Sequence, residues 1–331
     1  MGEAWESFGI GWDVRDRARI HALWDEVLDS GRWSEGPMVH GFEAVWSAWN
    51  GTDAVALSSW TGGALAALDW AGVRDEKVLV PSNTFMATPL AVIHAGATPV
   101  FADCNREDLC LSLAEVERGI AEHRPRAVFL VHIGGHIAFE VEAIAALCRA
   151  EGVALIEDCA HAHGASWNGK RPGTWGDAGI FSLYATKTVT TGEGGVLVSE
   201  NPEVLAHARA HRNYGKPDYT VSGLNFRMSE FTAALGMVQV ERMEEIARAK
   251  DELARTILDR RYAAHLELPD GMLSGRYKYV VFQPVERTTG RVYDMPCHRI
   301  LNTGDSLPNS DWVAENHWCP PLYYRAPAQT A

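Results

Sequence analysis

Four short apolar segments constrain the fold of this chain more than any other sequence feature. They span residues 77–81, 98–101, 126–132 and 154–157, and polar side chains hardly interrupt them. A strand with one face in water alternates apolar and polar residues, whereas a strand covered on both faces is apolar throughout. Helical segments separate these strands. We therefore predict a three-layer α/β fold whose mostly parallel central sheet lies between helices.

A tight turn at 59–63 lies between a predicted strand, 54–58, and a predicted helix, 64–70. A strand, a turn of small residues and a helix N-terminus together form an anion site, because free backbone N–H groups and the positive helix end point at the same place. An ordinary strand-to-helix turn would have the same residues, so this stretch alone leaves both interpretations open. Two more helices are predicted upstream, at 16–28, where apolar residues recur at helical spacing, and at 40–49.

One lysine stands in an unusual sequence environment. Lys187 lies among small hydroxylated residues and glycines at 181–195, directly after an apolar segment, 178–182, that predicts a short buried strand. We expect Lys187 to be partly desolvated, which lowers the pKa of its ammonium group and favours the neutral amine that forms Schiff bases with carbonyl compounds. The alternative is a surface lysine in a Gly/Thr loop, which is the more common case for so short a motif.

An aspartate at the end of another apolar segment gives this lysine a chemical context. Asp158 follows the predicted strand 154–157, and ligands of open α/β sheets bind at the carboxyl ends of the strands. Pyridoxal phosphate (PLP) needs a carboxylate that keeps its pyridine nitrogen protonated and a lysine that holds its aldehyde. Asp158 could instead cap a helix. Together, Asp158, Lys187 and the glycines around Lys187 favour a cofactor site.

These residues belong to a series of motifs that follow one another along nearly the whole chain. The chain resembles the DegT/StrS-type sugar aminotransferases, which are PLP enzymes of the aspartate aminotransferase fold (fold type I). Several spaced motifs in one order are a more specific signal than any single motif. The resemblance implies a PLP-dependent sugar aminotransferase of the EC 2.6.1 class. The matching stretches are 31–37, 81–88, 154–165, 181–195, 223–230 and 317–323.

The resemblance also implies roles for individual residues. Lys187 holds PLP and moves a proton during the reaction, and Asp158 pairs with the pyridine nitrogen. Phe85 lies against the ring face, although a core phenylalanine is an equal alternative at this position. His161 stands where relatives often carry a glutamine near the phenolic oxygen of PLP, and a histidine can donate the same hydrogen bond. The residues implied at the phosphate are Thr61, Gly62, Ser182 and Asn225.

A loop at 225–227 resembles one that relatives lend to a partner subunit. Asn225 of this loop is implied to reach the phosphate bound by the neighbouring chain. This implies a homodimer with shared active sites, since a two-fold axis gives each site one loop from the other subunit. A basic segment, 206–214, is the best local positive patch near the site, although a solvated helix face explains it at least as well.

The chain departs from the family pattern in two places. Relatives usually carry Ser-Gly-Thr where this chain has Trp60 between Ser59 and Thr61, so an indole replaces a glycine beside the phosphate. The C-terminal part is also shorter than in relatives, which could widen the substrate cleft.

The expected domains follow from this shortening. We predict a large PLP-binding domain at 1–245, which includes the N-terminal helices, and a small C-terminal α+β domain at 246–331. A long helix at 230–258 would join them, and a strand is predicted at 276–282.

Composition and charge exclude several classes of partner. A net charge of -13 argues against nucleic acid, because phosphate binding needs a basic surface. No apolar run approaches the roughly 18 residues that cross a bilayer, and the acidic N-terminus predicts no signal peptide. The six cysteines form no CxxC pair and indicate reduced thiols in a cytoplasmic protein. His161 and His163 have no third ligand at a matching spacing, so no metal is expected.

The favoured function is PLP-dependent conversion of a nucleotide-linked keto-sugar to an amino sugar with a glutamate-like amino donor. One alternative is a PLP-dependent sugar dehydratase of the same family, but those enzymes replace the lysine with histidine, and Lys187 argues against it. Another is a non-catalytic regulatory protein on the same scaffold. The sequence does not identify the sugar, the carbon that receives the amino group, or the nucleotide.

Overall fold

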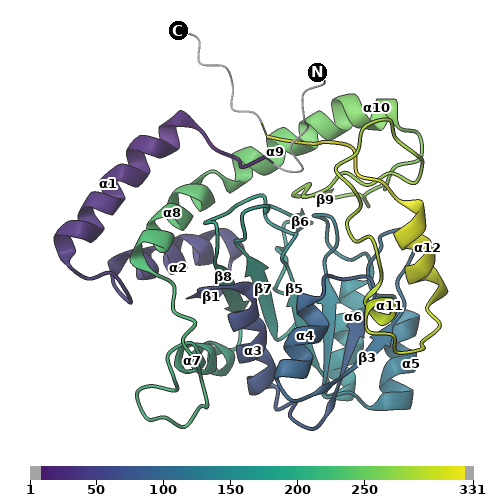
Figure 1. The fold of residues 1–331 in the computed structure, drawn as a ribbon, viewed down its shortest axis with the longest axis horizontal. Coiled ribbons are helices and arrows are strands. Elements are labelled where there is room, and N and C mark those ends of the chain that lie inside the picture. The colour runs from purple at the N-terminus through teal and green to yellow at the C-terminus, as the bar shows by residue number, and fades with distance from the viewer. Residues whose placement is uncertain (1–8, 325–331) are drawn as a thin grey trace.

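A seven-stranded sheet forms the centre of the molecule, in the order β1-β8-β7-β5-β4-β2-β3. The computed structural model describes residues 9–324, and Figure 1 shows the sheet enclosed by helices. Within this part of the chain only β8 runs against its neighbours, so the prediction of a mostly parallel sheet is confirmed. The strands are β1 (Asp53–Leu57), β2 (Lys77–Pro81), β3 (Thr98–Ala102), β4 (Ala127–Val131), β5 (Ala154–Asp158), β7 (Ala178–Ser182) and β8 (Gly195–Ser199).

The strands bury both faces, because successive strand residues point to opposite sides of a sheet. In β4, Val128 and Leu130 enter one core, with α2, α5, α6 and α8, and Phe129 enters the other, with α3, α4 and α7. The three-layer arrangement is thereby confirmed. These helices are α2 (Pro37–Asn50), α3 (Trp60–Trp70), α4 (Ala87–His94), α5 (Leu113–His123), α6 (Val141–Glu151), α7 (Pro202–His211) and α8 (Glu230–Glu241).

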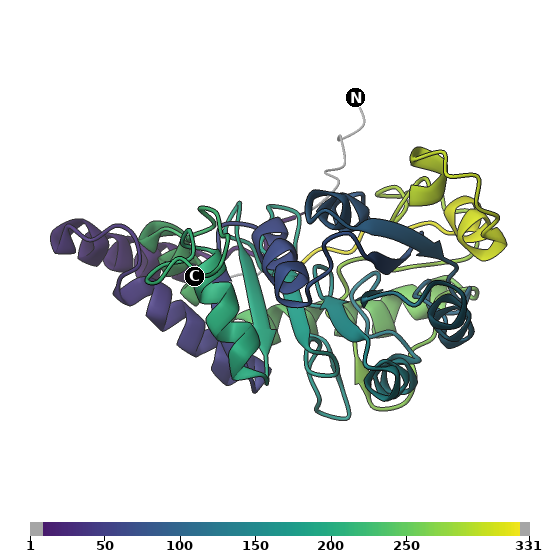
Figure 2. The same ribbon diagram turned by 90° about the horizontal axis from the view of Figure 1, so that it is seen from below.

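Side-chain caps set where two N-terminal helices begin. Helix α3 starts four residues earlier than predicted, because Ser59 Oγ accepts a hydrogen bond from the Gly62 N–H (3.2 Å) and caps the helix there. Helix α1 (Val14–Ser30) begins after Asp13, which forms a reciprocal capping box with Asp16. Helix α1 and the C-terminal helix α12 (Pro308–Asn316) lie at opposite ends of the molecule (Figures 1 and 2).

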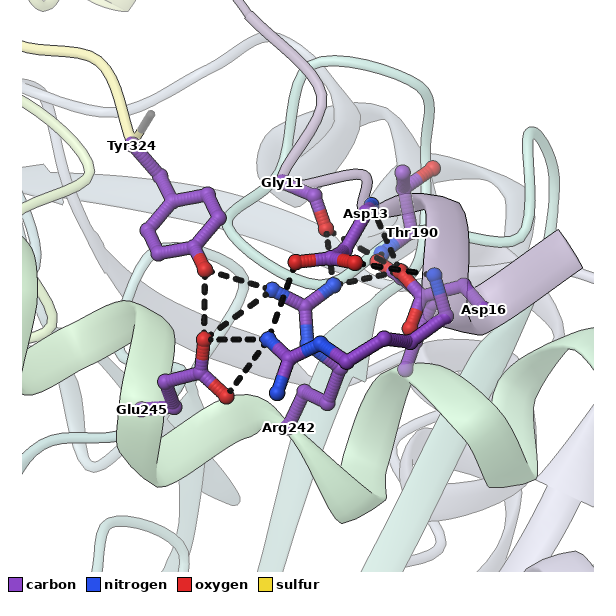
Figure 3. Close-up of polar contacts among 9 residues, drawn as sticks. Gly11, Asp13, Asp16, Thr190, Arg242, Glu245 and Tyr324 are labelled. Carbon is purple, nitrogen blue, oxygen red and sulfur yellow. Dashed lines mark hydrogen bonds and ion pairs between the residues drawn. The ribbon is translucent and has the colours of Figure 1, made fainter. Parts of the chain in front are cut away.

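The predicted helix at 230–258 is interrupted at Arg242. The guanidinium of Arg242 bonds to Asp16 of α1 and donates to the hydroxyl of Tyr324 (2.7 Å), while Tyr324 donates to Glu245 (2.5 Å), as Figure 3 shows. Arg242 therefore ties three separate parts of the chain together. After α8 the chain continues as α9 (Met243–Leu253), a π-helical turn (Ala254–Leu258) and α10 (Asp259–Arg261).

The prediction of a strand at 276–282 is wrong. This segment forms no regular strand, because its backbone groups pair with separate parts of the chain: the Lys278 N–H donates to the Gly134 carbonyl (2.8 Å) in the loop after β4, and the Phe282 N–H donates to the Ala264 carbonyl (2.7 Å). Only Val281 forms isolated bridges, to His265 and Trp318. The other described elements of this region are β9 (Met272–Leu273), which pairs with β6 (Ser166–Trp167), and α11 (Cys297–Ile300).

Four further predictions concern the chain as a whole. The expected domain boundary at 245/246 falls inside α9, and the division stays a prediction. None of the helices in residues 9–324 is long and apolar enough to cross a bilayer. All six cysteines are buried with free thiols. The absence of a signal peptide was predicted from the acidic N-terminus. Those N-terminal residues lie outside the described part of the chain.

Candidate active site

A cleft of about 490 Å³ opens where adjacent parallel strands end. The last residues of β4, β5 and β7, which are Val131, Asp158 and Ser182, all line it. This is the edge at which open α/β sheets bind ligands. The first turn of α3 forms another part of the wall. Of the residues implied by the resemblance, those lining the cleft are Thr61, Phe85, Asp158, His161, Ser182 and Lys187.

Lys187 reaches this cleft from the loop after β7 and is partly buried. Burial lowers the pKa of its ammonium group to about 8, the carboxylate of Asp158 opposes that shift, and the charge of Lys278 adds to it. Nζ of Lys187 lies 4.7 Å from the centre of the Tyr277 ring. The expected desolvation of Lys187 agrees with this environment, which makes the neutral amine accessible near neutral pH.

Glycines bring the lysine loop close to α3. A Cβ added at Gly195 would lie 2.4 Å from the backbone carbonyl of Ser59, so only glycine permits this approach. The loop itself is closed by bonds to Leu183, whose N–H donates to the Gly194 carbonyl (2.9 Å). The residues around Lys187 therefore fold as a compact unit against the start of α3.

Asp158 ends β5 and is almost fully buried. Its Oδ1 accepts from the indole Nε1–H of Trp60 (3.0 Å) and from the Ala160 N–H (3.0 Å), and its Oδ2 accepts from the Thr88 hydroxyl (3.2 Å). Burial raises the pKa of the carboxyl, while these bonds and the charge of Lys187 lower it. No helix begins after Asp158, so the helix-cap alternative does not hold.

Glu157, the residue before Asp158, anchors the end of β5. Its carboxylate accepts from the ring Nε2–H of His132 (2.9 Å) and from the N–H groups of Gly173 (2.9 Å) and Trp175 (2.7 Å). The Ala138 N–H donates to the other ring nitrogen of His132, which fixes the neutral tautomer. These bonds hold the strand so that Asp158 faces the cleft.

The donor set of the cleft fits PLP. A carboxylate offers about four acceptor positions, and the three bonds to Asp158 leave one on Oδ2 for a protonated ring nitrogen. A buried carboxylate with a raised pKa gains most from such a cation. Ser182 accepts from the Tyr184 N–H (3.3 Å), and its hydroxyl hydrogen makes no recorded bond in the described part of the chain. That hydrogen is suited to a phosphate oxygen near the start of α3.

Three comparisons with known proteins place this cleft in a family. The sequence model of the DegT/DnrJ/EryC1/StrS aminotransferase family matches residues 15–270. The chain belongs to this family. It is 34% identical to GDP-perosamine synthase of Vibrio cholerae over 239 residues, which cover 70% of this chain and 64% of that protein. It is 36% identical to dTDP-3-amino-3,4,6-trideoxy-alpha-D-glucose transaminase of Streptomyces venezuelae over 248 residues, which cover 73% of this chain and 65% of that protein.

The chain thus spans slightly less than two thirds of the length of these relatives. A solved structure extends the likeness over most of the fold. The DegT-family chain superimposes on DesV of Streptomyces venezuelae, solved in complex with a ketimine intermediate, with a TM-score of 0.86 and 29% identity. The superposition covers 93% of this chain and 90% of DesV.

Trp60, the main departure from the family pattern, turns its side chain toward Asp158. The indole is buried, packs at 36° on Phe129 and donates to the Asp158 carboxylate. Its side chain is thus occupied beneath the cleft, while its backbone forms the first turn of α3. The glycine of relatives is therefore replaced by a residue that contributes a hydrogen bond to the site.

His161 is buried in a stack of aromatic rings. It lies 4.0 Å from Tyr277 and 5.8 Å from Tyr293, measured between ring centres. Burial and the charge of Lys187 hold its pKa well below the usual range, and its Nδ1 accepts from the Gly134 N–H (3.4 Å). The neutral ring therefore carries its hydrogen on Nε2 and can donate one bond, as the resemblance implies.

Two other expected residues take different positions. Phe85 is 65% exposed at the cleft, so the alternative of a core phenylalanine is excluded. His163 is buried, neither ring nitrogen has a hydrogen-bond partner among the described residues, and burial lowers its pKa to about 3. It packs edge-on against Trp46 and Phe181 as a neutral core side chain.

Asn225 and Gly62 do not line the cleft of their own chain. Asn225 is exposed, and its carbonyl oxygen accepts from the Arg227 N–H (3.4 Å). A Cβ at Gly62 would lie 2.7 Å from the Phe226 ring, so this glycine lets the loop pack against the start of α3. The loop at 225–227 therefore lies beside the expected phosphate position with Asn225 facing outward.

The expected positive patch at 206–214 is partly neutralised. Arg209 and Arg212 both pair with the carboxylate of Glu43, at 2.7 and 2.6 Å. Burial opposes ionisation of Glu43, but these two arginines hold its pKa below the usual range. The two guanidinium groups therefore fasten α7 to α2, and Glu43 offsets one of their two charges.

Sequence reasoning did not assign Thr88, Tyr277 and Tyr293 to the site, although all three line the cleft. Thr88 belongs to the matched motif at 81–88, which offered a signal. The two tyrosines come from the C-terminal region, where Tyr277 was placed in a strand. Their approach to His161 depends on long-range packing that no local pattern encodes.

Proposed function

We propose that this chain is a PLP-dependent aminotransferase that converts a nucleotide-linked keto-sugar to an amino sugar. The amino group comes from an amino-acid donor such as glutamate. The observation that carries this proposal is the pair formed by Lys187, with its pKa lowered to about 8, and the buried carboxylate of Asp158 in one cleft. Family membership and the sugar transaminases among the relatives support it.

Each of the following cleft residues has its own role in the proposed reaction. PLP, when bound, supplies an aldehyde for the amino group and an electron-withdrawing ring. Lys187 holds the cofactor through Nζ and afterwards moves a proton as base and acid, for which a pKa near 8 is suited. Asp158 keeps a proton on the ring nitrogen. The Nε2–H of His161 and the hydroxyl of Ser182 would orient the phenolic oxygen and the phosphate, together with Thr61 at the start of α3.

Two rival functions have distinct signatures. A sugar dehydratase would carry histidine where this chain has Lys187, so Lys187 favours transamination. A non-catalytic scaffold would bind no PLP. Incubation with PLP should give an absorbance band near the visible edge, and Lys187→Ala should abolish it. After borohydride reduction, peptide mapping should find the pyridoxyl group on Lys187, and a label on another lysine would refute the assignment.

The substrate is tested by assaying a panel of nucleotide-linked keto-sugars with glutamate and with glutamine as donors. Amination of at least one sugar, lost in Lys187→Ala, is the expected result. A protein that binds PLP through Lys187 but aminates no sugar with either donor would contradict the proposed substrate class. It would leave the scaffold function as the better interpretation.

We further propose a homodimer in the cytoplasm, with the domain division at 245/246. The outward-facing Asn225 beside the start of α3 supports a shared site, since it is free to reach a neighbouring subunit. Six free thiols support a reducing compartment.

A further inference from the structure

A second, smaller cavity adjoins the cleft. It measures about 120 Å³ and shares Thr186, Lys187 and Tyr277 with the larger one. Nζ of Lys187 and Nζ of Lys278 lie 4.7 and 5.8 Å from the centre of the same Tyr277 ring. Polar groups also come from Lys250, Lys278, Thr188 and Thr289. We call this cavity the lysine pocket.

Lys250 is the unusual member of this pocket. It lies on α9 and is only 7% exposed, and its ammonium group makes no hydrogen bond or ion pair with the side chains and backbone of residues 9–324. A buried ammonium group without a partner is costly, so native proteins normally pair it. Burial and the charges of Lys278 and Arg276 lower its pKa to about 7. Lys250 therefore occupies a position that an anion would stabilise.

The described residues around the pocket do not supply that anion. No carboxylate lines the lysine pocket in the described part of the chain. Asp251, the neighbour of Lys250, is already paired with Arg255 (2.6 Å) and Arg276 (2.9 Å). Lys278 donates to the carbonyl (3.4 Å) and hydroxyl (3.2 Å) of Thr289, which are both neutral acceptors. Positive charge is thus in excess around a space large enough for a small anion.

We propose that the lysine pocket binds the α-carboxylate of the amino-acid donor, with Lys250 and Lys278 as its cationic ligands. This inference rests on the proposed transamination. The amine and the α-carboxylate of an amino acid are bonded to the same carbon. The donor amine must reach the cofactor atom to which Nζ of Lys187 is bonded. The α-carboxylate of the donor therefore lies near Lys187, which lines both the cleft and the lysine pocket. The pocket is too small for a nucleotide-linked sugar, which leaves the larger cleft for the keto substrate.

Lys250→Met in the PLP-loaded enzyme isolates this role. The substitution removes the charge and keeps much of the volume, and it leaves in place Asp158 and Lys278, the charged groups that act on the pKa of Lys187. The donor KM should rise about 10-fold or more, as expected for losing a bond to a charged group. The keto-sugar KM should stay within about two-fold. Acetate should compete with the donor in the wild type and compete more weakly in the variant.

Two further variants complete the experiment. Lys278→Met should also raise the donor KM, with an additional change in the pH profile because Lys278 acts on the pKa of Lys187. Lys77→Met is the matched control, since this exposed lysine lies at the opposite end of β2 from the cleft. Thermal unfolding of each variant shows whether it is folded, and Lys250→Met should melt at or above the wild-type temperature.

Unchanged donor KM in folded Lys250→Met would overturn the proposal, as would an equal rise in the keto-sugar KM. Titration calorimetry of the PLP-loaded protein keeps the test separate from the proposed function. Even if no sugar is aminated, 2-oxoglutarate should bind the wild type and bind Lys250→Met at least about 10-fold more weakly. Equal binding by both proteins, or binding of chloride and inorganic phosphate without any carboxylate, would refute a carboxylate site.

Discussion

Replacing Trp60 by phenylalanine tests how the chain holds its buried carboxylate. The indole Nε1–H donates to Asp158 Oδ1 at 3.0 Å, and phenylalanine keeps most of the packing against Phe129 while removing the donor. A hydrogen bond to a charged group contributes about 1.5–3 kcal/mol to stability, against about 0.5–1.5 kcal/mol for a neutral pair. We therefore expect the free energy of unfolding of the apo protein to fall by about 1.5–3 kcal/mol at pH 8.

The pH dependence of this loss follows from the pKa of Asp158. Burial raises the folded-state pKa above the unfolded value, so stability from this group is present at low pH and is lost as pH rises through the folded pKa. The Trp60 bond limits that loss because it stabilises the ionised carboxylate. Trp60→Phe should raise the pKa of Asp158 further. The substitution should therefore lower the free energy of unfolding by a larger amount at high pH than at low pH.

Urea unfolding of the apo protein across pH 4–8, at one protein concentration, measures this difference. Trp24→Phe is the matched control, because the Trp24 indole also donates at 3.0 Å but to the neutral carbonyl of Phe231. Its loss should be about 0.5–1.5 kcal/mol and independent of pH. Equal, pH-independent losses in Trp60→Phe and Trp24→Phe would refute the argument that the Trp60 bond stabilises a charge.

Three more results are expected. Asp158→Asn should still bind PLP weakly but lower kcat/KM about 100-fold or more, since a broken buried ion pair costs about 3–5 kcal/mol; near wild-type turnover would exclude its role at the ring nitrogen. The association rate of PLP with the apo protein should rise with pH around the Lys187 pKa of about 8, because the neutral amine attacks, and stopped-flow absorbance would reveal a flat profile if the lysine were unperturbed. Mixed dimers of Lys187→Ala with a chain carrying Asn225→Ala and Arg227→Ala should regain part of the activity, and no recovery despite proven subunit exchange would speak against a shared site.

Local sequence patterns were sufficient for most strands of the sheet, although β8 was not predicted. The segments at 77–81 and 178–182 form β2 and β7 with the predicted bounds, because a strand buried on both faces has no other stable environment. The strand at 276–282 failed for a non-local reason. Its backbone bonds go to separate parts of the chain and not to one strand: Lys278 donates to Gly134, more than a hundred residues away, and Val281 donates to Trp318.

The candidate site likewise combines residues that local motifs predict with residues that only long-range packing brings together. Lys187 and Asp158 were recognisable because their short motifs carry the relevant chemistry locally. The contact between Trp60 and Asp158 joins residues 98 positions apart, and Trp60 drew notice only as a departure from the family pattern. Lys250 gave no signal, because a lysine on an amphipathic helix is normally solvated. Its burial follows from the packing of α9 against the C-terminal region.

The contacts that Arg242 makes with the N-terminal part of the chain affect folding during synthesis. The bond from Arg242 to Asp16 spans 226 positions, and α1 packs its apolar residues, among them Ile20, Leu23 and Val27, near α8. At a ribosomal rate of about 5–20 residues per second, α1 waits roughly 10–45 s before these partners emerge. During that interval its apolar stripe is open to other nascent chains. We therefore expect α1 to need protection until the chain has been made as far as Arg242.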